Sequence, residues 1–201
     1  MTASKNGRFN QRRRTRNDLL MAAGRLLKAG KKPTMEDVAE EALVSRATAY
    51  RYFPSLEELL VEAPINENVP IAEEVFSGDV PEDPEERIDF AEAALHDMIY
   101  KNENELRVML MNSLKLWLNN DNHKIPVRQN RRAHLIETAL APVRDELGKE
   151  KFKKLSAALS VFFGPESMIV YRDVYPLDKE QARKVKSWAV RALVRAALDD
   201  S

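Results

Sequence analysis

The chain has 201 residues, of which 44% are hydrophobic and 32% are charged, a balance typical of a folded globular protein. It contains no cysteine, which excludes disulfides, thiol catalysis and metal centres held by cysteine. The formal net charge is zero, yet residues 1–32 hold ten Lys and Arg against one acid (+9), and residues 62–105 hold fourteen acids against two bases (−12). This sorting favours a polyanion-binding module joined to a part that does not bind polyanions, although a basic N-terminal run can also be a solvated tail.

The first predicted helix follows a basic segment. Residues 1–14 are expected to form a flexible basic arm. From Thr15 onward apolar residues recur every three or four positions, which indicates one buried helix face. These residues are Leu19, Ala22, Ala23, Leu26 and Leu27. Gly30 is a stop signal, so the helix is expected to end just before it.

Three short helices are predicted next, each opened by a hydroxyl-bearing cap. Thr34 caps the first of them, with Asp37 three positions later in a capping-box arrangement. Ser45 caps the second, Arg46–Tyr52, which ends where a Phe-Pro pair follows. Ser55 caps the third. The sequence therefore predicts a compact helical module within residues 1–63.

Prolines interrupt the chain after this module. Because proline breaks helix interiors, we expect the helix that begins after Ser55 to be cut early, and no long helix to cross residues 64–84. The four prolines of this segment are Pro64, Pro70, Pro81 and Pro84. One or two helical turns are possible at Ile71–Phe76. The segment 64–84 is predicted to be an acidic junction between residues 1–63 and a second domain, 85–201.

Beyond Pro84 the pattern is helical to the end of the chain. The predicted helices cover Glu85–Lys101, Glu105–Leu118, Val127–Leu147, Lys151–Tyr175 with an interruption at Gly164-Pro165, and a last helix to about Leu198. Asn119–Pro126 is expected to be a polar turn, and Asp178 with Gln181 forms a capping box for the last helix. Apolar residues nowhere alternate long enough to indicate strands, so the predicted fold class is all-α.

The helix Arg46–Tyr52 carries the residues that suggest a function. Small and hydroxyl-bearing side chains let a helix enter a DNA major groove, arginine can bind a guanine edge, and hydroxyls can reach phosphates. The candidate DNA-contacting residues of this helix are Arg46, Ala47, Thr48, Tyr50 and Tyr52. Ser45 is expected to serve first as a cap and second as a phosphate contact, whereas Val44 and Phe53 are expected in the core. A solvated or phosphate-bound Arg46 is the alternative to base recognition.

These residues closely resemble the helix-turn-helix of the TetR family of bacterial transcriptional regulators. The matching positions are Thr34, Val38-Ala39, the run from Val44 to Phe53, and Glu57-Glu58-Leu59. The resemblance implies an N-terminal three-helix DNA-binding domain and a larger C-terminal helical domain. It also implies that Thr34 contacts DNA. The basic arm is expected to add non-specific phosphate attraction through Arg12, Arg13, Arg14 and Arg16.

Three positions depart from the family pattern. Leu56 stands where the family usually has a lysine, so the phosphate contact implied there is missing. Leu43 stands where a glycine commonly makes the turn, which predicts a turn of a different type. Pro64 falls inside a helix that often links the two domains of the family, which weakens any inference about how the domains are coupled.

The resemblance further implies a homodimer and a small-molecule effector. The dimer would form through two helices at about 151–175 and 178–198, and would read a pseudo-palindromic operator in double-stranded DNA. The candidate pocket residues are Met98, Met109, Leu110, Ser113, Trp117, His134, Phe162, Phe163 and Met168. A methionine and aromatic stripe of this kind is also consistent with plain core. Lys124, Arg128, Arg131 and Arg132 are expected to pair with the acidic stretch rather than to bind an acidic ligand.

Other classes of function fit the sequence less well than a repressor released by an effector. Neither catalytic nor phosphate-loop motifs occur, and His96, His123 and His134 lack the Glu-x-x-His spacing of di-metal bundles, so we expect no enzyme, cofactor or metal. A helical adaptor or architectural protein without sequence-specific DNA binding is the alternative. The basic N-terminus lacks the apolar stretch of a secretory signal, and the apolar runs are too short to span a bilayer, which predicts a cytoplasmic protein.

Overall fold

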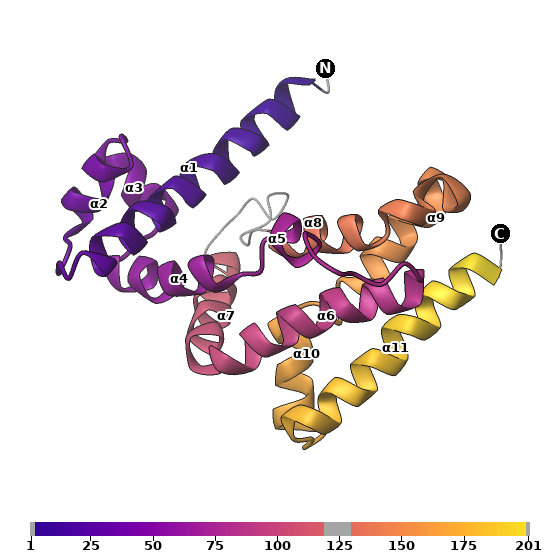
Figure 1. The fold of residues 1–201 in the computed structure, drawn as a ribbon. Coiled ribbons are helices and arrows are strands. Elements are labelled where there is room, and N and C mark those ends of the chain that lie inside the picture. Colours follow the sequence, from indigo (N-terminus) through magenta and orange to yellow (C-terminus); the bar gives the residue numbers. More distant parts are fainter. Residues whose placement is uncertain (1–2, 119–129, 200–201) are drawn as a thin grey trace. The chain divides into compact units, whose positions relative to one another are not determined.

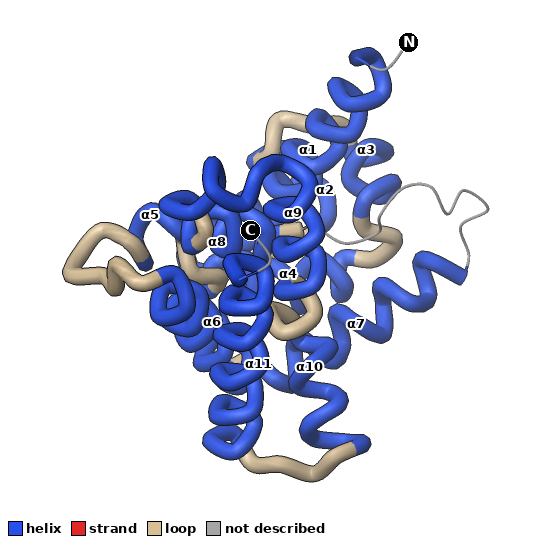
Figure 2. The backbone as a smooth tube through the Cα atoms, turned by 90° about the vertical axis from the view of Figure 1, so that its right-hand side faces the viewer, coloured by secondary structure: helices blue, strands red, loops and turns tan. Residues whose placement is uncertain are grey.

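The computed structural model describes residues 3–118 and 130–199. Within these ranges every regular element is a helix, which confirms the predicted all-α class (Figures 1 and 2). The described residues divide into two compact units: an N-terminal unit made of residues 3–68 and 104–118, and a C-terminal unit made of residues 69–103 and 130–199. None of the described helices is long and apolar enough to cross a membrane. The domain boundaries expected from the sequence stay a prediction.

The N-terminal unit contains five helices within the described residues. They are α1 (Ala3–Lys28), α2 (Met35–Glu41), α3 (Arg46–Tyr52), α4 (Leu56–Asn68) and most of α7 (Glu103–Leu118). α1 packs against α4 and α2, and α2 packs against α3 (Figure 1). The core between them is formed by fully buried apolar side chains, among them Leu19, Leu20, Phe53 and Leu59.

The predicted flexible arm is wrong, because the backbone of residues 3–14 belongs to α1. Residues 3–28 contain no proline, and arginine has a high helix propensity. The buried side chains of Leu19 and Leu20 stabilise the C-terminal part of the helix. Adding residues to an existing helix is much easier than nucleating one. The helix therefore continues into the basic segment.

The predicted caps are confirmed. Thr34 accepts a hydrogen bond from the Asp37 amide at 3.2 Å, and the Thr34 amide donates to the Asp37 carboxylate at 2.7 Å, which closes a capping box. The Ser45 hydroxyl accepts from the amide of Thr48 at 3.1 Å. The Ser55 hydroxyl accepts from the amide of Glu58 at 3.2 Å. Local caps thus fix where α2, α3 and α4 begin.

Leu43 makes the turn between α2 and α3 with the backbone conformation that a glycine would adopt. Its φ is +56°, the left-handed region, and its side chain is 92% exposed. The Val44 amide donates to the Ala39 carbonyl at 2.9 Å and the Leu43 amide to the Glu40 carbonyl at 3.0 Å, which closes the end of α2. The backbone of the turn is therefore left-handed although its residue is leucine.

The predicted cut at Pro64 is also wrong, because α4 runs through it to Asn68. Ala63 and Ile65, on either side of the proline, are 0% and 1% exposed. Proline removes the hydrogen bond to the carbonyl four residues earlier, here Leu60, and its ring crowds that carbonyl. Burial of the flanking apolar residues compensates for this loss and keeps the segment helical.

The C-terminal unit is built around a long antiparallel helix pair, α6 (Pro84–Lys101) and α11 (Lys179–Asp199) (Figure 1). The other elements are α5 (Ala72–Val75), α8 (Arg131–Ala139), α9 (Arg144–Leu159), α10 (Pro165–Ile169), the 3₁₀ turn Ala141–Val143 and the π-helical turn Val170–Val174. The capping box predicted for the last helix is confirmed by mutual hydrogen bonds of Asp178 and Gln181 at 2.8 and 3.0 Å. α11 packs on α6 and α9.

One helix predicted in this unit is wrong in extent. The single helix expected over 127–147 is divided by the 3₁₀ turn, which holds Pro142; residues 127–129 lie outside the described residues. A residue before proline avoids the helical region, so the chain bends there. The predicted stop at Gly148 is confirmed: its φ is +65°, and it marks a kink between two helical segments that α9 joins. The predicted interruption at Gly164-Pro165 is confirmed, since α10 begins at Pro165.

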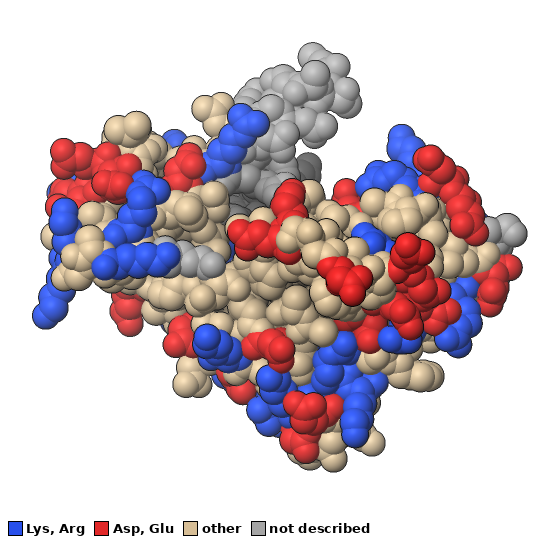
Figure 3. All heavy atoms as spheres, viewed as in Figure 1, with Lys and Arg blue, Asp and Glu red and all other residues tan. Residues whose placement is uncertain are grey.

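Acidic residues of α6 pair with basic residues of α11 along the whole helix pair. The ion pairs are Glu85–Arg195, Asp89–Arg191, Asp89–Arg183, Glu92–Lys186 and Asp97–Lys179. Figure 3 accordingly shows acidic and basic side chains interspersed on the visible surface. The expectation that Arg132 pairs with the acidic stretch is wrong: it pairs with Glu166 at 3.1 Å and donates to the Ser160 carbonyl. Lys124 and Arg128 lie outside the described residues.

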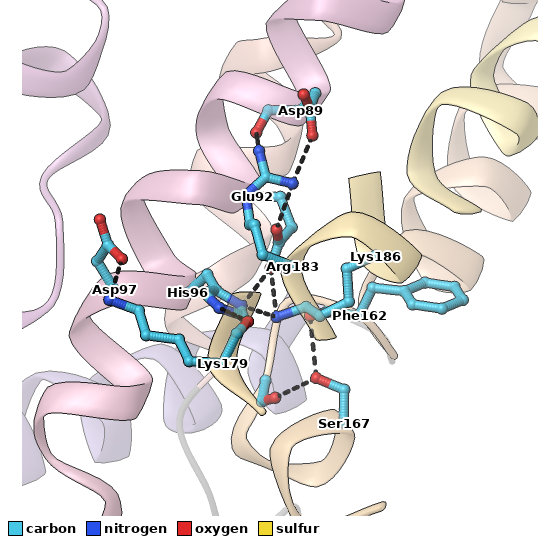
Figure 4. A network of polar contacts seen from close by, with 10 residues as sticks. Asp89, Glu92, His96, Asp97, Phe162, Ser167, Lys179, Arg183 and Lys186 are labelled. Atoms are coloured by element: carbon cyan, nitrogen blue, oxygen red, sulfur yellow. Dashed lines mark hydrogen bonds and ion pairs between the residues drawn. The ribbon is translucent and has the colours of Figure 1, made fainter. Parts of the chain in front are cut away.

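The middle of this helix pair contains a buried polar cluster of Glu92, His96 and Lys186, each at most 1% exposed (Figure 4). Lys186 Nζ contacts the Glu92 carboxylate and donates to His96 Nδ1 at 3.2 Å. His96 Nε2 lies 3.1 Å from the Lys179 carbonyl oxygen, which can only accept, so Nε2 carries the proton. Burial, followed by the charge of Lys186, lowers the pKa of His96 to about 4.

Candidate nucleic-acid interface

α3 presents one exposed face and one buried face. Arg46, Ala47, Tyr50 and Arg51 are exposed, whereas Ala49 is fully buried in the core of the N-terminal unit. Successive residues of a helix turn by about 100°, so these four exposed residues cover one continuous strip. Phe53, directly after the helix, is 1% exposed. The buried residues thus anchor α3 to the N-terminal unit. The four exposed residues form an Arg/Tyr strip on its outer face.

Two residues expected on this exposed strip lie elsewhere. Thr48 and Tyr52 are half-buried, and Tyr52 packs against the hydrophobic core of the unit. The Thr48 hydroxyl lies 2.9 Å from the Ser45 hydroxyl and so belongs to the cap. Sequence reasoning missed Arg51, although the same helical spacing places it beside Ala47. A contact of Thr48 or Tyr52 with DNA stays a prediction.

Arg46 is held at the edge of this strip by two neighbours. Its Nη1 forms an ion pair with the Glu36 carboxylate of α2, and its guanidinium lies 5.5 Å from the centre of the Tyr50 ring. A hydrogen bond to the Tyr50 side chain, followed by the charge of Glu36, raises the pKa of Arg46 above its ordinary value. The Arg46 side chain is 61% exposed. Its remaining donors are therefore open to a partner in solution.

Thr34 lies exposed at the start of α2. Its hydroxyl donates to the Asp37 carboxylate at 2.7 Å, and the hydrogen bonds from Thr34 lower the pKa of Asp37. The hydroxyl proton is thus already used within the cap. Lys31 and Lys32, which lie just before α2 and are exposed, offer further positive charge that the sequence motif does not include.

The arginines of the basic segment have different positions. Arg14 is exposed on α1, whereas the side chains of Arg12 and Arg13 lie outside the described residues. Arg16, expected to attract phosphates, is engaged within the protein: it makes two hydrogen bonds of 2.7 Å to Glu62 on α4. Its guanidinium also lies 4.2 Å from the centre of the Phe53 ring. Arg16 therefore fixes α1 to α4 within the N-terminal unit.

Leu56, at the start of α4, stands where the family usually has a lysine. Its side chain is half-buried and packs against the core of the N-terminal unit. A leucine in this position strengthens the core, and it supplies no positive charge toward a phosphate.

The predicted pocket residues have mixed positions. Phe163 and Met168 are 1% and 0% exposed in the core of the C-terminal unit, and Met98 and Phe162 in the same unit are half-buried. On α7, in the N-terminal unit, Met109 is buried, Leu110 and Ser113 are half-buried, and Trp117 is 48% exposed. His134 is exposed and pairs with Glu73 at 2.7 Å, so it is not an interior residue. A ligand pocket stays a prediction.

The helices expected to form a dimer expose apolar side chains. Trp188 on α11 is 73% exposed, and Val185 one turn earlier is 39% exposed. The opposite side of α11 is occupied by α6, because Ala182, Lys186 and Val190 are fully buried. Within the range 151–175, Val161 and Val174 are 59% and 74% exposed. Dimerisation through these helices stays a prediction.

In a comparison with protein families, residues 20–63 match the family model of bacterial regulatory proteins of the tetR family. The match covers α2 and α3 completely, together with the last third of α1 and the first part of α4. No curated protein and no solved structure matches the chain.

Proposed function

We propose that the chain binds a specific operator and represses transcription, as a regulator of the TetR family whose model residues 20–63 match. In this proposal the protein is a cytoplasmic homodimer that leaves its operator when a small molecule binds to the C-terminal helices. It acts by binding and does not catalyse a reaction.

The observation that carries this proposal is the exposed strip of α3. A short helix anchored by Ala49 and Phe53 presents Arg46, Tyr50 and Arg51 outward, and the described side chains of the N-terminal unit leave all three exposed. Such a helix fits a major groove about 12 Å wide, in which arginine can recognise guanine through two parallel hydrogen bonds. Ala47 allows close approach of the backbone.

The exposed side of α11 supports the homodimer. Trp188 offers a large apolar surface, and Ala189, Ala192 and Leu193 on neighbouring turns are half-exposed. Small side chains allow two helices to approach closely. A two-fold dimer would place two copies of α3 about one turn of DNA apart, roughly 34 Å, and so would read a pseudo-palindrome.

The experiment that tests this proposal is selection of binding sites from random duplex DNA, followed by affinity measurements over a range of salt concentrations. We expect a pseudo-palindromic site to be enriched. Failure to bind any duplex at low salt would instead support the adaptor alternative, and binding without sequence preference would contradict the proposed regulator.

Two arginine substitutions then separate recognition of bases from attraction to phosphates. Arg46→Ala should weaken binding to the selected site by about 1–3 kcal/mol and relax its sequence preference. Arg14→Ala removes the same charge from α1. It should weaken binding to DNA of any sequence about equally and make the salt dependence of binding shallower. Identical behaviour of the two variants would show that Arg46 does not read bases.

A further inference from the structure

Glu36 is an acidic residue beside the face that is proposed to approach DNA. It occupies the first turn of α2, its side chain is 51% exposed, and it forms an ion pair with Arg46 of α3. The capping of α2 does not require it, because Asp37 closes the capping box with Thr34. An exposed ion pair contributes little to folding stability. Neither helix capping nor stability therefore explains why this carboxylate faces Arg46.

We propose that Glu36 is a specificity-determining residue, which keeps Arg46 away from phosphates and directs it to a guanine edge. This inference rests on the proposed function. Glu36 does not itself need to touch a base; it acts through the Arg46 side chain and is in that sense a positioning residue.

The donors of the Arg46 guanidinium explain how the carboxylate selects between partners. Arginine has five N–H donors in a planar fork, and Glu36 engages Nη1, which leaves donors along the other edges of the guanidinium. A phosphate must compete with the Glu36 carboxylate for the same positive charge, and the two anions repel each other. A guanine offers O6 and N7, which are neutral acceptors and meet weaker repulsion. The carboxylate thus penalises phosphate binding more than base recognition.

Tyr50 also contacts the Arg46 side chain. The Arg46 guanidinium carbon lies over the Tyr50 ring, 5.5 Å from its centre. Tyr50 and Glu36 together restrict the rotamers of a long side chain that is 61% exposed. A side chain that is already ordered loses less entropy when it binds.

The test compares Glu36→Gln with Glu40→Gln. Both substitutions remove one negative charge from exposed positions of α2, but among the described contacts only Glu36 forms an ion pair with Arg46. Dissociation constants are measured for the selected operator and for a random duplex of equal length, over a range of salt concentrations. Circular dichroism confirms that both variants are folded.

For Glu36→Gln we expect the ratio of operator affinity to random-duplex affinity to fall about tenfold, mainly because the random duplex is bound more tightly. The salt dependence of random-duplex binding should steepen by about one counterion, since Arg46 now reaches a phosphate. Glu40→Gln should change both affinities by a similar small factor and leave the ratio unchanged. Adding Glu36→Gln to Arg46→Ala should not lower the ratio further, because the effect passes through Arg46.

The possible results distinguish this inference from the proposed function. If the wild-type protein shows no sequence preference, the proposed function fails, and the inference fails with it. If the wild-type protein selects an operator and Glu36→Gln keeps the same ratio and salt dependence, only the inference is overturned. The inference is also overturned if Glu40→Gln lowers the ratio as much as Glu36→Gln.

Discussion

Leu43 occupies a backbone position that favours glycine, at the turn before the proposed recognition helix. The left-handed conformation costs a residue with a Cβ about 1–2 kcal/mol, and the 92% exposed side chain recovers almost nothing through packing. Leu43→Gly should therefore raise the free energy of unfolding by about 1 kcal/mol, measured by urea denaturation. Leu43→Ala is the matched control, because it removes the side chain and keeps the Cβ. Equal stability of the two variants would show that the turn is not strained.

His96 gives the protein a pH dependence whose sign follows from its environment. Its pKa in the folded state is about 4, against an ordinary value of 6.5, and it faces Lys186, Arg183, Glu92 and Asp97. A base whose pKa is depressed by folding binds its proton more tightly in the unfolded chain, so stability is lost as the pH falls from about 6.5 toward 4.

The resulting loss for His96 between pH 7 and pH 5 is about 2 kcal/mol. We expect the variant His96→Gln, which keeps a polar side chain, to be less stable at pH 7 but to lose less stability between pH 7 and pH 5. Chemical denaturation of both proteins at the two pH values measures this difference. A wild-type protein that is as stable at pH 5 as at pH 7, with the variant behaving identically, would contradict the assignment. Glu92 opposes the trend, because burial raises its pKa.

At the scale of elements, the ion pair of Glu92 and Lys186 fixes α6 against α11 in one register. Both side chains are 0% exposed. Removing one partner leaves a charge without its closest counter-ion in the interior, which costs about 3–5 kcal/mol, whereas replacing both partners with apolar residues is often neutral. Lys186→Met should therefore destabilise the protein strongly, and Glu92→Met together with Lys186→Met should restore most of the loss, as measured by urea denaturation. If the double variant is no more stable than Lys186→Met, the Glu92–Lys186 pair contributes more to stability than the mutual compensation of two buried charges.

Helix α4 carries a second prediction at this scale. Pro64 lies in its interior and prevents the hydrogen bond that the Leu60 carbonyl would otherwise accept. Pro64→Ala restores a donor in a helix that is already formed, so we expect a stabilisation of about 1–3 kcal/mol and a higher melting temperature. Pro54→Ala, which lies outside the helices on either side of it, is the control and should not stabilise the protein in this way. A destabilised Pro64→Ala would indicate that the local backbone geometry set by Pro64 is required for packing.

For the whole molecule, the parts that could be predicted from the sequence are those decided by neighbours along the chain. Thr34, Ser45 and Asp178 are predictable as caps because their partners lie three positions away. Arg16 lies in a basic run and so resembles a phosphate-binding arginine in the sequence. Its partner in the structure, Glu62, lies 46 positions away, and no local pattern signals that contact. Lys186 follows the same rule: a lysine in an amphipathic helix indicates a solvent-exposed position, but Glu92 and His96 make a buried one possible. Long-range charge pairing had to be seen in the structure.

The last prediction concerns the assembly in which two copies of α3 would act together. Trp188 is 73% exposed on the side of α11 that does not pack on α6. Trp188→Glu introduces a charge there, and in a two-fold interface each substitution is present twice, so two carboxylates would enter the same apolar contact. We expect sedimentation velocity to show monomers, with folding unchanged because the residue contributes little to the core.

Loss of the dimer should weaken binding to the selected operator by a factor of about 10²–10⁴, because the second half-site would no longer be bound at high effective concentration. Affinity for a single half-site should stay nearly the same, since α3 is unaltered. Ile71→Glu, at a 52% exposed position outside α11, is the control and should preserve both the dimer and the operator affinity. If Trp188→Glu remains dimeric, another surface joins the protomers. If it is monomeric but binds the whole operator as tightly as before, recognition does not depend on two linked copies of α3, and the pseudo-palindromic operator loses its physical basis.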